Sequence, residues 1–368
     1  MEMLPGTEGR KQRAMTVSYE KCLETVARIF ERAGVQRERA YQLADLFVTT
    51  EAKGVWSHGV GLVLKYTEQF LKRTINTEPD IRILKKFPSC AVMDGDQGPG
   101  ITVLEQAIAL AVKMASETGV GSVTITNLQH YAAGLYYAPG VTAKGKILTL
   151  MANSPASMAP YGGTEKYYGT NPFTFAAPMG ELPCYCLDMA SSVCAGNKLE
   201  NAMNLGESVP EGLGLDRNGR PTTDPEEILL HGSLLPFGGA KGSGIAGMVN
   251  IMAGILSGGA YETDVISLCR DVKKPANYGC YVQVLDIAKF MDMKEYNRRA
   301  EKWGRAVLAN PPAKEAGQVV YPGYLEELRY REAQENGLKL SDISLRNLKL
   351  AAELVGINSE KLFKKIAV

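Results

Sequence analysis

The sequence predicts an α/β (α+β) protein in which helical segments from both chain ends flank a β-rich middle. Helical spacing of apolar residues dominates residues 19–73, and helices return after about residue 290. Between them, from about residue 81, short β-rich runs alternate with Gly-rich turns. The length of 368 residues is sufficient for two domains with cores of their own.

Three helices are expected first. In "YEKCLETVARIFERAGV" the apolar residues from Cys22 to Phe30 recur at helical spacing, and Gly34 follows as a stop. A second amphipathic stretch, "RERAYQLADLFVTTEAKGV", follows directly, and residues 60–73 continue the helical unit.

The middle of the chain reads as strands and loops. "CAVMDGD", "GSVTITN" and "KILTLMAN" are expected as strands, with a helix at "TVLEQAIALAVKMASETG". Cys184 and Cys186 alternate in "PCYCLDM", which predicts one face of a strand. Residues 151–245 are rich in Gly, Pro and Asn and are expected to be loops that carry function.

The late elements are a buried helix at "MVNIMAGILSGGAY", a strand at "CYVQVLDIAKF" and helices from "YNRRAEKWGRAVLA" onward. The final helix, "DISLRNLKLAAELVGI", is expected to be capped by Ser341 or Asp342.

Composition excludes several classes of function. Lysine plus arginine (41) nearly balances aspartate plus glutamate (40), so no strong field favours nucleic acid or an acidic membrane, and a small-molecule ligand is expected. Seven cysteines without a C-x-x-C pair indicate reduced thiols in a cytoplasm. An apolar signal segment and an 18-residue apolar run are both missing, so we expect a cytoplasmic protein without membrane spans.

Residues 242–247, GSGIAG, match the G-x-G-x-x-G pattern of Rossmann dinucleotide sites. The preceding "LLPFGGAK" has a proline and two glycines where that site needs a strand, which argues against the Rossmann interpretation. Two alternatives stay open. Lys241 and the glycine-rich loop can present a cation and backbone N–H groups to a phosphate, or the glycines serve only close helix packing.

The chain has only three histidines, and their surroundings differ. Ser57 fits a helix N-cap, which favours a structural role for Ser57 and His58. His130 follows the expected strand "SVTITN", where catalytic side chains concentrate, and His231 reads as incidental. Together His58 and His130 could supply a general acid and a group that positions substrate.

Nucleophile and metal sites find no support in the spacing of residues. The sequence has no G-x-S-x-G elbow and no H-x-x-x-H or H-E-x-x-H pattern, so no metal site is expected. Redox chemistry with a bound cofactor, or simple binding, remains.

Seven stretches in order resemble one family: "SHGVGLVLKY", "NLQHYAAGLYY", "NSPASMAPYGGTEKYYGTNPFTFAAP", "LDMASSV", "VPEGLGLDRNGRPTTDP", "LLPFGGAKGSGIAG" and "YPG". From about residue 16 to the C-terminus the chain is similar to the malate/L-lactate dehydrogenase family of NAD(P)-dependent oxidoreductases. Ureidoglycolate and sulfolactate dehydrogenases, 2,3-diketogulonate reductase and piperideine-2-carboxylate reductase are members of that family.

The resemblance implies a non-Rossmann cofactor domain with a largely antiparallel sheet, and a helical domain built from both chain ends. The corresponding boundaries are a tail at 1–14, a helical substrate and dimer domain at 15–80 with 300–368, and a cofactor domain at 81–299. It also implies a homodimer with the active site in the cleft between domains.

The resemblance assigns residues as follows. His58 matches the proton donor, with Ser57 beside it, and His130 matches a second active-site histidine. NAD or NADP would be held by residues matching the family's cofactor segments: Leu187, Asp188, Met189, Ala190, Ser191, Ser192, Val193, Ala240, Lys241, Gly323 and Tyr324. Ser154 would line the substrate site, and Asn171 would shape its floor.

Two departures from the family pattern stand out. Leu62 replaces the arginine that clamps a substrate carboxylate, so either Lys65 substitutes, or the substrate lacks the carboxylate, or another loop binds the anion. Tyr324 replaces the glutamate of the family's P-G-E, which removes one expected carboxylate on the cofactor side.

The reaction implied by the resemblance is hydride transfer between a nicotinamide and a small 2-oxo acid/2-hydroxy acid pair or a related ketone. A cyclic imine reductase that forms a cyclic amino acid is the alternative within enzymes, because both reactions need a hydride and a proton. A nucleotide-binding member without turnover is the alternative outside enzymes. The choice between NAD and NADP and the direction of the reaction stay open.

Overall fold

A computed structural model describes residues 15–267, 274–314 and 316–359. Its centre is a seven-stranded sheet with the order β2-β3-β4-β10-β5-β6-β7. The pair β3–β4 is parallel and the other neighbours are antiparallel. The strands are β2 (Arg82–Lys86), β3 (Cys90–Asp94), β4 (Val120–Leu128), β5 (Lys146–Ala152), β6 (Phe173–Met179), β7 (Leu182–Met189) and β10 (Tyr278–Asp286). The expected mixed α/β fold with a largely antiparallel sheet is confirmed.

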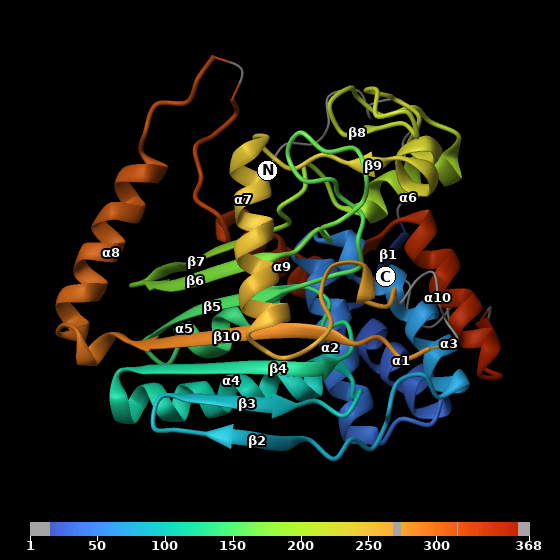
Figure 1. Ribbon diagram of the computed structural model, residues 1–368. Helices are drawn as coiled ribbons and strands as arrows, with labels where there is room; N and C mark the ends of the chain where they lie inside the picture. The colour runs from blue at the N-terminus through green and yellow to red at the C-terminus, as the bar shows by residue number, and fades with distance from the viewer. Residues whose placement is uncertain (1–14, 268–273, 315, 360–368) are drawn as a thin grey trace.

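Helices cover both faces of this sheet (Figure 1). α4 (Gly100–Thr118) and α5 (Ala138–Thr142) lie against one face. α7 (Ala240–Val249), continued by the π-helical turn η5 (Asn250–Ile255), crosses the other face, and α8 (Met293–Leu308) packs near the β6 edge.

A bundle of helices from both chain ends stands at one end of the sheet (Figure 1). It contains α1 (Tyr19–Arg32), α2 (Arg37–Ala52), α3 (Val63–Lys72), α9 (Tyr324–Asn336) and α10 (Asp342–Leu354). β1 (Met15–Val17) pairs antiparallel with β11 (Leu338–Leu340), which joins the two ends of the described chain.

Local sequence explains the bundle helices. The Ser18 hydroxyl accepts a hydrogen bond from the Lys21 N–H at the start of α1, and Val26, Ile29 and Phe30 are fully buried on its inner face. Ser341, one of the two expected caps, accepts from the Ser344 N–H at the start of α10.

The segment 151–245 is less irregular than expected. It contains the expected strand at Cys184–Cys186, which is confirmed as part of β7, and also β6, α6 (Gly196–Leu205) and the start of α7. Two-stranded β8 (Gly214–Leu215) and β9 (Ser233–Leu234) complete a small lobe with α6 and the π-helical η4 (Glu227–His231).

The helix expected at residues 248–261 exists only as far as Ile255, and its predicted burial is wrong for one side. Val249 and Ala253 are fully buried against the sheet, whereas Ile251 and Ile255 are 56% and 54% exposed. Apolar side chains project from this helix on all sides, but the sheet covers only one side.

Candidate active site

His58 and His130 are brought together although 72 positions separate them in the chain. Their ring centroids lie 5.6 Å apart and the rings are nearly parallel, at 22°. His58 ends the 3-10 turn η1 (Trp56–His58) between α2 and α3, and His130 follows directly after β4. Both side chains are partly exposed, so the pair faces a site that a small molecule can reach.

His130 is fixed by Tyr66, a fully buried residue of α3. The Tyr66 hydroxyl donates to the His130 carbonyl at 2.7 Å and lies 2.9 Å from His130 Nδ1. Space is also limited there, because a Cβ on Gly100 would lie 2.3 Å from the His130 carbonyl oxygen. The helix bundle therefore fixes the position of His130, which follows strand β4 of the sheet.

Ser57 holds His58 and does not cap a helix. Its hydroxyl lies 2.9 Å from His58 Nδ1, while the N-cap positions of η1 and α3 are Val55 and Leu62. The expectation that Ser57 is an N-cap is wrong, because η1 and the second 3-10 turn η2 (Val60–Leu62) intervene before α3 begins.

A buried carboxylate anchors the loop after His58. Glu51 of α2 accepts hydrogen bonds from the Val60 N–H at 2.9 Å and from the Ser344 hydroxyl at 3.1 Å. Burial raises the pKa of Glu51 to about 7, and these two hydrogen bonds oppose the increase. Gly59 fits because a Cβ there would lie 2.1 Å from a Glu51 carboxylate oxygen.

Both histidines are uncharged near neutral pH. Desolvation lowers the pKa of His58 to about 4 and that of His130 to about 3, and electrostatic interaction with His58 and Lys65 contributes to the shift of His130. A neutral ring can accept a proton from a hydroxyl group. It becomes a general acid when an anionic ligand raises its pKa.

The segment after β7 and the start of α7 are held side by side. The Ser191 N–H donates to the Thr170 carbonyl at 2.8 Å, and the Ser191 carbonyl accepts from the Phe237 N–H at 3.1 Å. A Cβ on Gly242 would lie 2.8 Å from that same Ser191 oxygen, so this glycine allows the close approach. Ser192 and Val193 continue the contact through Pro236 and Leu235, and Ala190 lies between Met189 and Ser191 in the same segment.

Ser154 and Asn171 belong to the same network. The Ser154 hydroxyl lies 3.2 Å from the Thr170 hydroxyl, and the Ser154 N–H donates to Asn171 Oδ1 at 3.2 Å. Asn171 Nδ2 donates to the Ala246 carbonyl of α7 at 3.0 Å. Buried Asn171 therefore ties the β6 entry to α7.

Asp188 faces the histidines' side of the sheet. Its carboxylate accepts from the Thr174 hydroxyl at 2.7 Å and from the Leu135 N–H at 3.0 Å, in the turn that follows His130. Burial raises its pKa, and the same hydrogen bonds oppose the change. Leu187, on the opposite face of β7, lines an apolar groove with Tyr185, Phe175 and Trp303.

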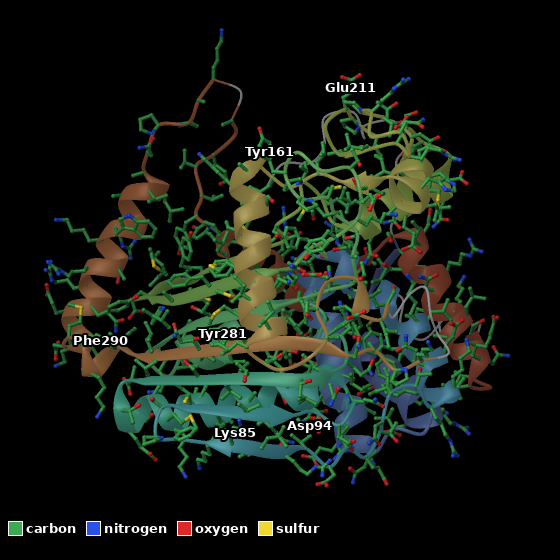
Figure 2. The ribbon with its side chains drawn as sticks, viewed as in Figure 1. Lys85, Asp94, Tyr161, Glu211, Tyr281 and Phe290 are labelled. Atoms are coloured by element: carbon green, nitrogen blue, oxygen red, sulfur yellow. The ribbon has the colours of Figure 1, made fainter. Side chains whose placement is uncertain are left out.

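The glycines of GSGIAG lie inside α7, not in a loop between a strand and a helix. α7 begins at Ala240, and the exposed Ala240 and Lys241 form its first turn after the N-cap Gly239. Figure 2 shows the exposed side chain of Tyr161 at this end of α7. A helix N-terminus with an adjacent lysine fits a phosphate group, which is what a nicotinamide dinucleotide would present there.

Gly323 packs on the edge of β7. The Pro322 carbonyl accepts from the Cys186 N–H at 2.9 Å, and a Cβ on Gly323 would lie 2.8 Å from the Cys184 carbonyl oxygen. Tyr324 begins α9. The Glu326 carboxylate accepts from the Gly323 N–H at 3.2 Å and contributes to the raised pKa of Asp188, so a carboxylate lies near β7 despite Tyr324.

Leu62 is buried at 7% exposure, and Lys65 lies one turn further along α3. The Lys65 ammonium pairs with Glu200 of α6, with Nζ 3.3 Å from Oε2. A second contact joins α6 to η1, because Asn197 Nδ2 donates to the Ser57 carbonyl at 2.7 Å. Glu200 and Asn197 were missed, since the sequence analysis expected loops in this part of the chain.

Three further observations concern the described residues only. No group of three or more His, Cys, Asp and Glu side chains could hold a metal ion. None of the helices is both long and apolar enough to span a membrane. The cysteines there are free thiols, Cys269 lies outside the described ranges, and His231 is an exposed residue at the end of η4.

Several known enzymes are similar to this chain over most of its length. A malate dehydrogenase from Pyrococcus horikoshii is 33% identical over 348 residues, which cover 93% of this chain and 96% of that protein. A ureidoglycolate dehydrogenase (NAD(+)) from Escherichia coli is 32% identical over 328 residues, covering 89% and 93%. A Delta(1)-pyrroline-2-carboxylate/Delta(1)-piperideine-2-carboxylate reductase from Pseudomonas putida is 31% identical over 331 residues, covering 89% and 93%.

The solved structure of the Pyrococcus horikoshii malate dehydrogenase matches with a TM-score of 0.87 at 31% identity, covering 95% of this chain and 97% of that one. The family model described as malate/L-lactate dehydrogenase matches residues 17–349. The relatives are dehydrogenases or reductases that act on CH–OH or C=N groups, and this chain is an oxidoreductase of the same kind. It belongs to the malate/L-lactate dehydrogenase family.

Proposed function

We propose that this oxidoreductase transfers a hydride between the nicotinamide of NAD or NADP and a small 2-oxo acid/2-hydroxy acid pair or a related ketone. The observation that carries the proposal is the stacked pair of His58 and His130, with the Asp188 carboxylate bonded to the turn that follows His130. When bound, the cofactor supplies or accepts the hydride, and the side chains handle the proton and the developing charge.

His58 is assigned the proton transfer at the substrate oxygen. In the oxidative direction its neutral ring accepts the hydroxyl proton. In the reductive direction it donates one, for which negative charge developing on the substrate oxygen raises its pKa. Ser57 orients the ring through Nδ1, which leaves Nε2 for the substrate. His130, fixed by Tyr66, holds the polar group of the substrate.

The cofactor residues are proposed from the network around the end of β7. Lys241 and the first turn of α7 would hold phosphate, residues 188–193 would line the dinucleotide, and Ser154 would line the substrate site. Gly323 would complete this wall from the edge of β7. The binding mode differs from the Rossmann type, because GSGIAG lies within a helix.

A cyclic imine reductase is the second candidate, favoured by the relative named as a pyrroline and piperideine carboxylate reductase. The test is loss of NADH or NADPH absorbance with 2-oxo acids, keto-sulfonates, carboxylate-free ketones and cyclic imines. Oxidation of cofactor with 2-oxo acids supports the first candidate, and turnover of imines alone supports the second. Silence with all four classes, with nucleotide still bound, would leave a nucleotide-binding member without turnover.

His58→Ala separates chemistry from structure. We expect turnover to fall by about 10²- to 10⁴-fold, the usual contribution of a general acid–base group, with cofactor affinity nearly unchanged. Equal activity in the variant would rule out the assigned role.

The expected homodimer is part of the same proposal, and light scattering at several protein concentrations would measure it.

A further inference from the structure

Lys65 is the cation of α3 that lies near the paired histidines. It precedes Tyr66, whose hydroxyl lies 2.9 Å from His130 Nδ1. Its ammonium pairs with α6, which also donates a hydrogen bond to the Ser57 carbonyl next to His58. Leu62, one turn earlier, is buried and has no group that binds an anion. A carboxylate that bound beside the histidines from this side would therefore meet Lys65.

A carboxylate of the protein already occupies this ammonium. Glu200 Oε1 and Oε2 lie 3.4 and 3.3 Å from Lys65 Nζ, so both oxygens face the lysine as those of a substrate carboxylate would. The Lys65 and Glu200 side chains are 29% and 41% exposed. Pairs with this exposure stabilise proteins only weakly, so a competing carboxylate can replace Glu200.

The helix that carries Glu200 has a second attachment to the same region. Asn197, one turn earlier on α6, donates to the Ser57 carbonyl, next to His58. When Glu200 separates from Lys65, the hydrogen bond from Asn197 to Ser57 still attaches α6 to η1. The exchange at Lys65 therefore requires movement of one side chain, without displacement of the helix.

We propose that Glu200 is a specificity-determining residue, which occupies the carboxylate-binding position of Lys65 until the carboxylate of a 2-oxo acid replaces it. The inference rests on the proposed function and names how its substrate is held. A 2-oxo acid forms an ion pair with Lys65 but must displace Glu200, whereas a carboxylate-free ketone binds with the Lys65–Glu200 pair intact. Glu200 therefore lowers the affinity for acids selectively.

Glu200→Gln tests this, because glutamine has nearly the same shape without the charge. Assayed with saturating NADH or NADPH, the variant should lower KM for 2-oxo acids by about fivefold, the upper range for an exposed pair, with kcat unchanged. KM for carboxylate-free ketones should not change. Lys65→Met should raise KM for acids, and adding Glu200→Gln to it should have no further effect.

Two control variants separate charge from structure. Glu332→Gln removes an exposed carboxylate that pairs with Lys339 at 3.5 Å, far along the chain from α6, and should leave both KM values unchanged. Asn197→Ala loosens α6 without releasing Lys65. If Asn197→Ala reproduces the acid-selective fall in KM, mobility of α6 is the cause and the proposal is overturned. An unchanged or raised KM for acids in Glu200→Gln overturns it as well.

Binding of oxamate, a non-reacting analogue of a 2-oxo acid, distinguishes this inference from the proposed function. Its affinity is measured by quenching of the fluorescence of bound NADH or NADPH. Tighter oxamate binding by Glu200→Gln, together with absence of turnover, would support the role of Glu200 while the proposed reaction failed. Equal oxamate binding by the wild-type protein, Glu200→Gln and Lys65→Met would refute the role of Glu200 even if 2-oxo acids were reduced.

Discussion

The hydroxyl of Tyr66 lies between two atoms of His130, 2.7 Å from its carbonyl oxygen and 2.9 Å from Nδ1. A carbonyl oxygen can only accept, so the single phenolic proton goes to it. We infer that Nδ1 carries a proton and donates to the Tyr66 oxygen, in preference to accepting the longer 3.4 Å contact from the Ala132 N–H. His130 Nε2 is then an acceptor for a substrate hydroxyl.

Tyr66→Phe should remove this control while keeping the aromatic packing against Phe47. We expect kcat to fall about fivefold, because loss of one hydrogen bond of about 1 kcal/mol frees the ring to rotate and change tautomer. The affinity for NADH or NADPH, measured by fluorescence titration, should not change. Equal kcat values for the two proteins would contradict the assigned position of His130.

Gly59→Ala should displace His58, because the new Cβ would lie 2.1 Å from a Glu51 oxygen and 3.0 Å from the Glu51 Cα. We expect the free energy of unfolding to fall by about 1–3 kcal/mol, and kcat to fall by a larger fraction of its wild-type value. Gly61→Ala is the matched control in the same loop, since its Cβ would meet the Ser344 hydroxyl at an ordinary 3.6 Å. Thermal unfolding and kcat of both variants check the prediction.

The lowered pKa values of His58 and His130 should make the protein sensitive to acid. An unfolded histidine titrates near pH 6.5, whereas the pKa values are about 4 for His58 and about 3 for His130. Below pH 6.5 the unfolded chain binds more protons, so the free energy of unfolding should fall by about 1.4 kcal/mol per pH unit for each histidine until the folded pKa is reached. Denaturant titrations from pH 7 to pH 4.5 would show that the free energy of unfolding falls less per pH unit in His130→Gln than in the wild type. An equal fall in both proteins would exclude His130 as a source of the acid sensitivity.

Glu51 should act in the opposite direction. Its folded pKa of about 7 lies above the value of about 4.5 expected for an unfolded glutamate, so its protonation stabilises the folded state at low pH. This contribution is lost as the pH rises through 7. Glu51→Gln keeps an acceptor for the Val60 N–H and should be more stable than the wild type by about 2 kcal/mol at pH 8, but not at pH 4.5. Glu20→Gln, at the exposed start of α1, should show no such dependence.

The elements that local sequence determines were predicted well. α1, α2 and α10 follow from apolar spacing, α10 also from its cap Ser341, and β4, β5 and β10 from short apolar runs between turns. α6 was not predicted, because it lies in a segment rich in Gly, Pro and Asn and its ten residues bury only Leu199. The exposed side of Ile251 and Ile255 was equally unpredictable, since apolarity alone does not say which side of a helix the sheet will cover.

For the site, two rare histidines and the motifs shared with the family were sufficient to name most of the residues that the structure brings together. Their partners were not predictable. Tyr66 meets His130 across 64 positions, and Lys65 meets Glu200 across 135, so these contacts depend on the packing of the bundle against the sheet. The role of Ser57 was misjudged because an N-cap and a ring-orienting hydroxyl have the same sequence signature.

β7 places Asp188 toward the histidine turn and Leu187 toward the apolar groove, with the Cys186 N–H bonded to Pro322. Neighbouring strand residues point to opposite faces, so gaining or losing a single residue between Leu182 and Asp188 would exchange these two surroundings. A carboxylate would then enter the groove, and a leucine would face Thr174. The surroundings of both side chains therefore depend on the number of residues in this strand.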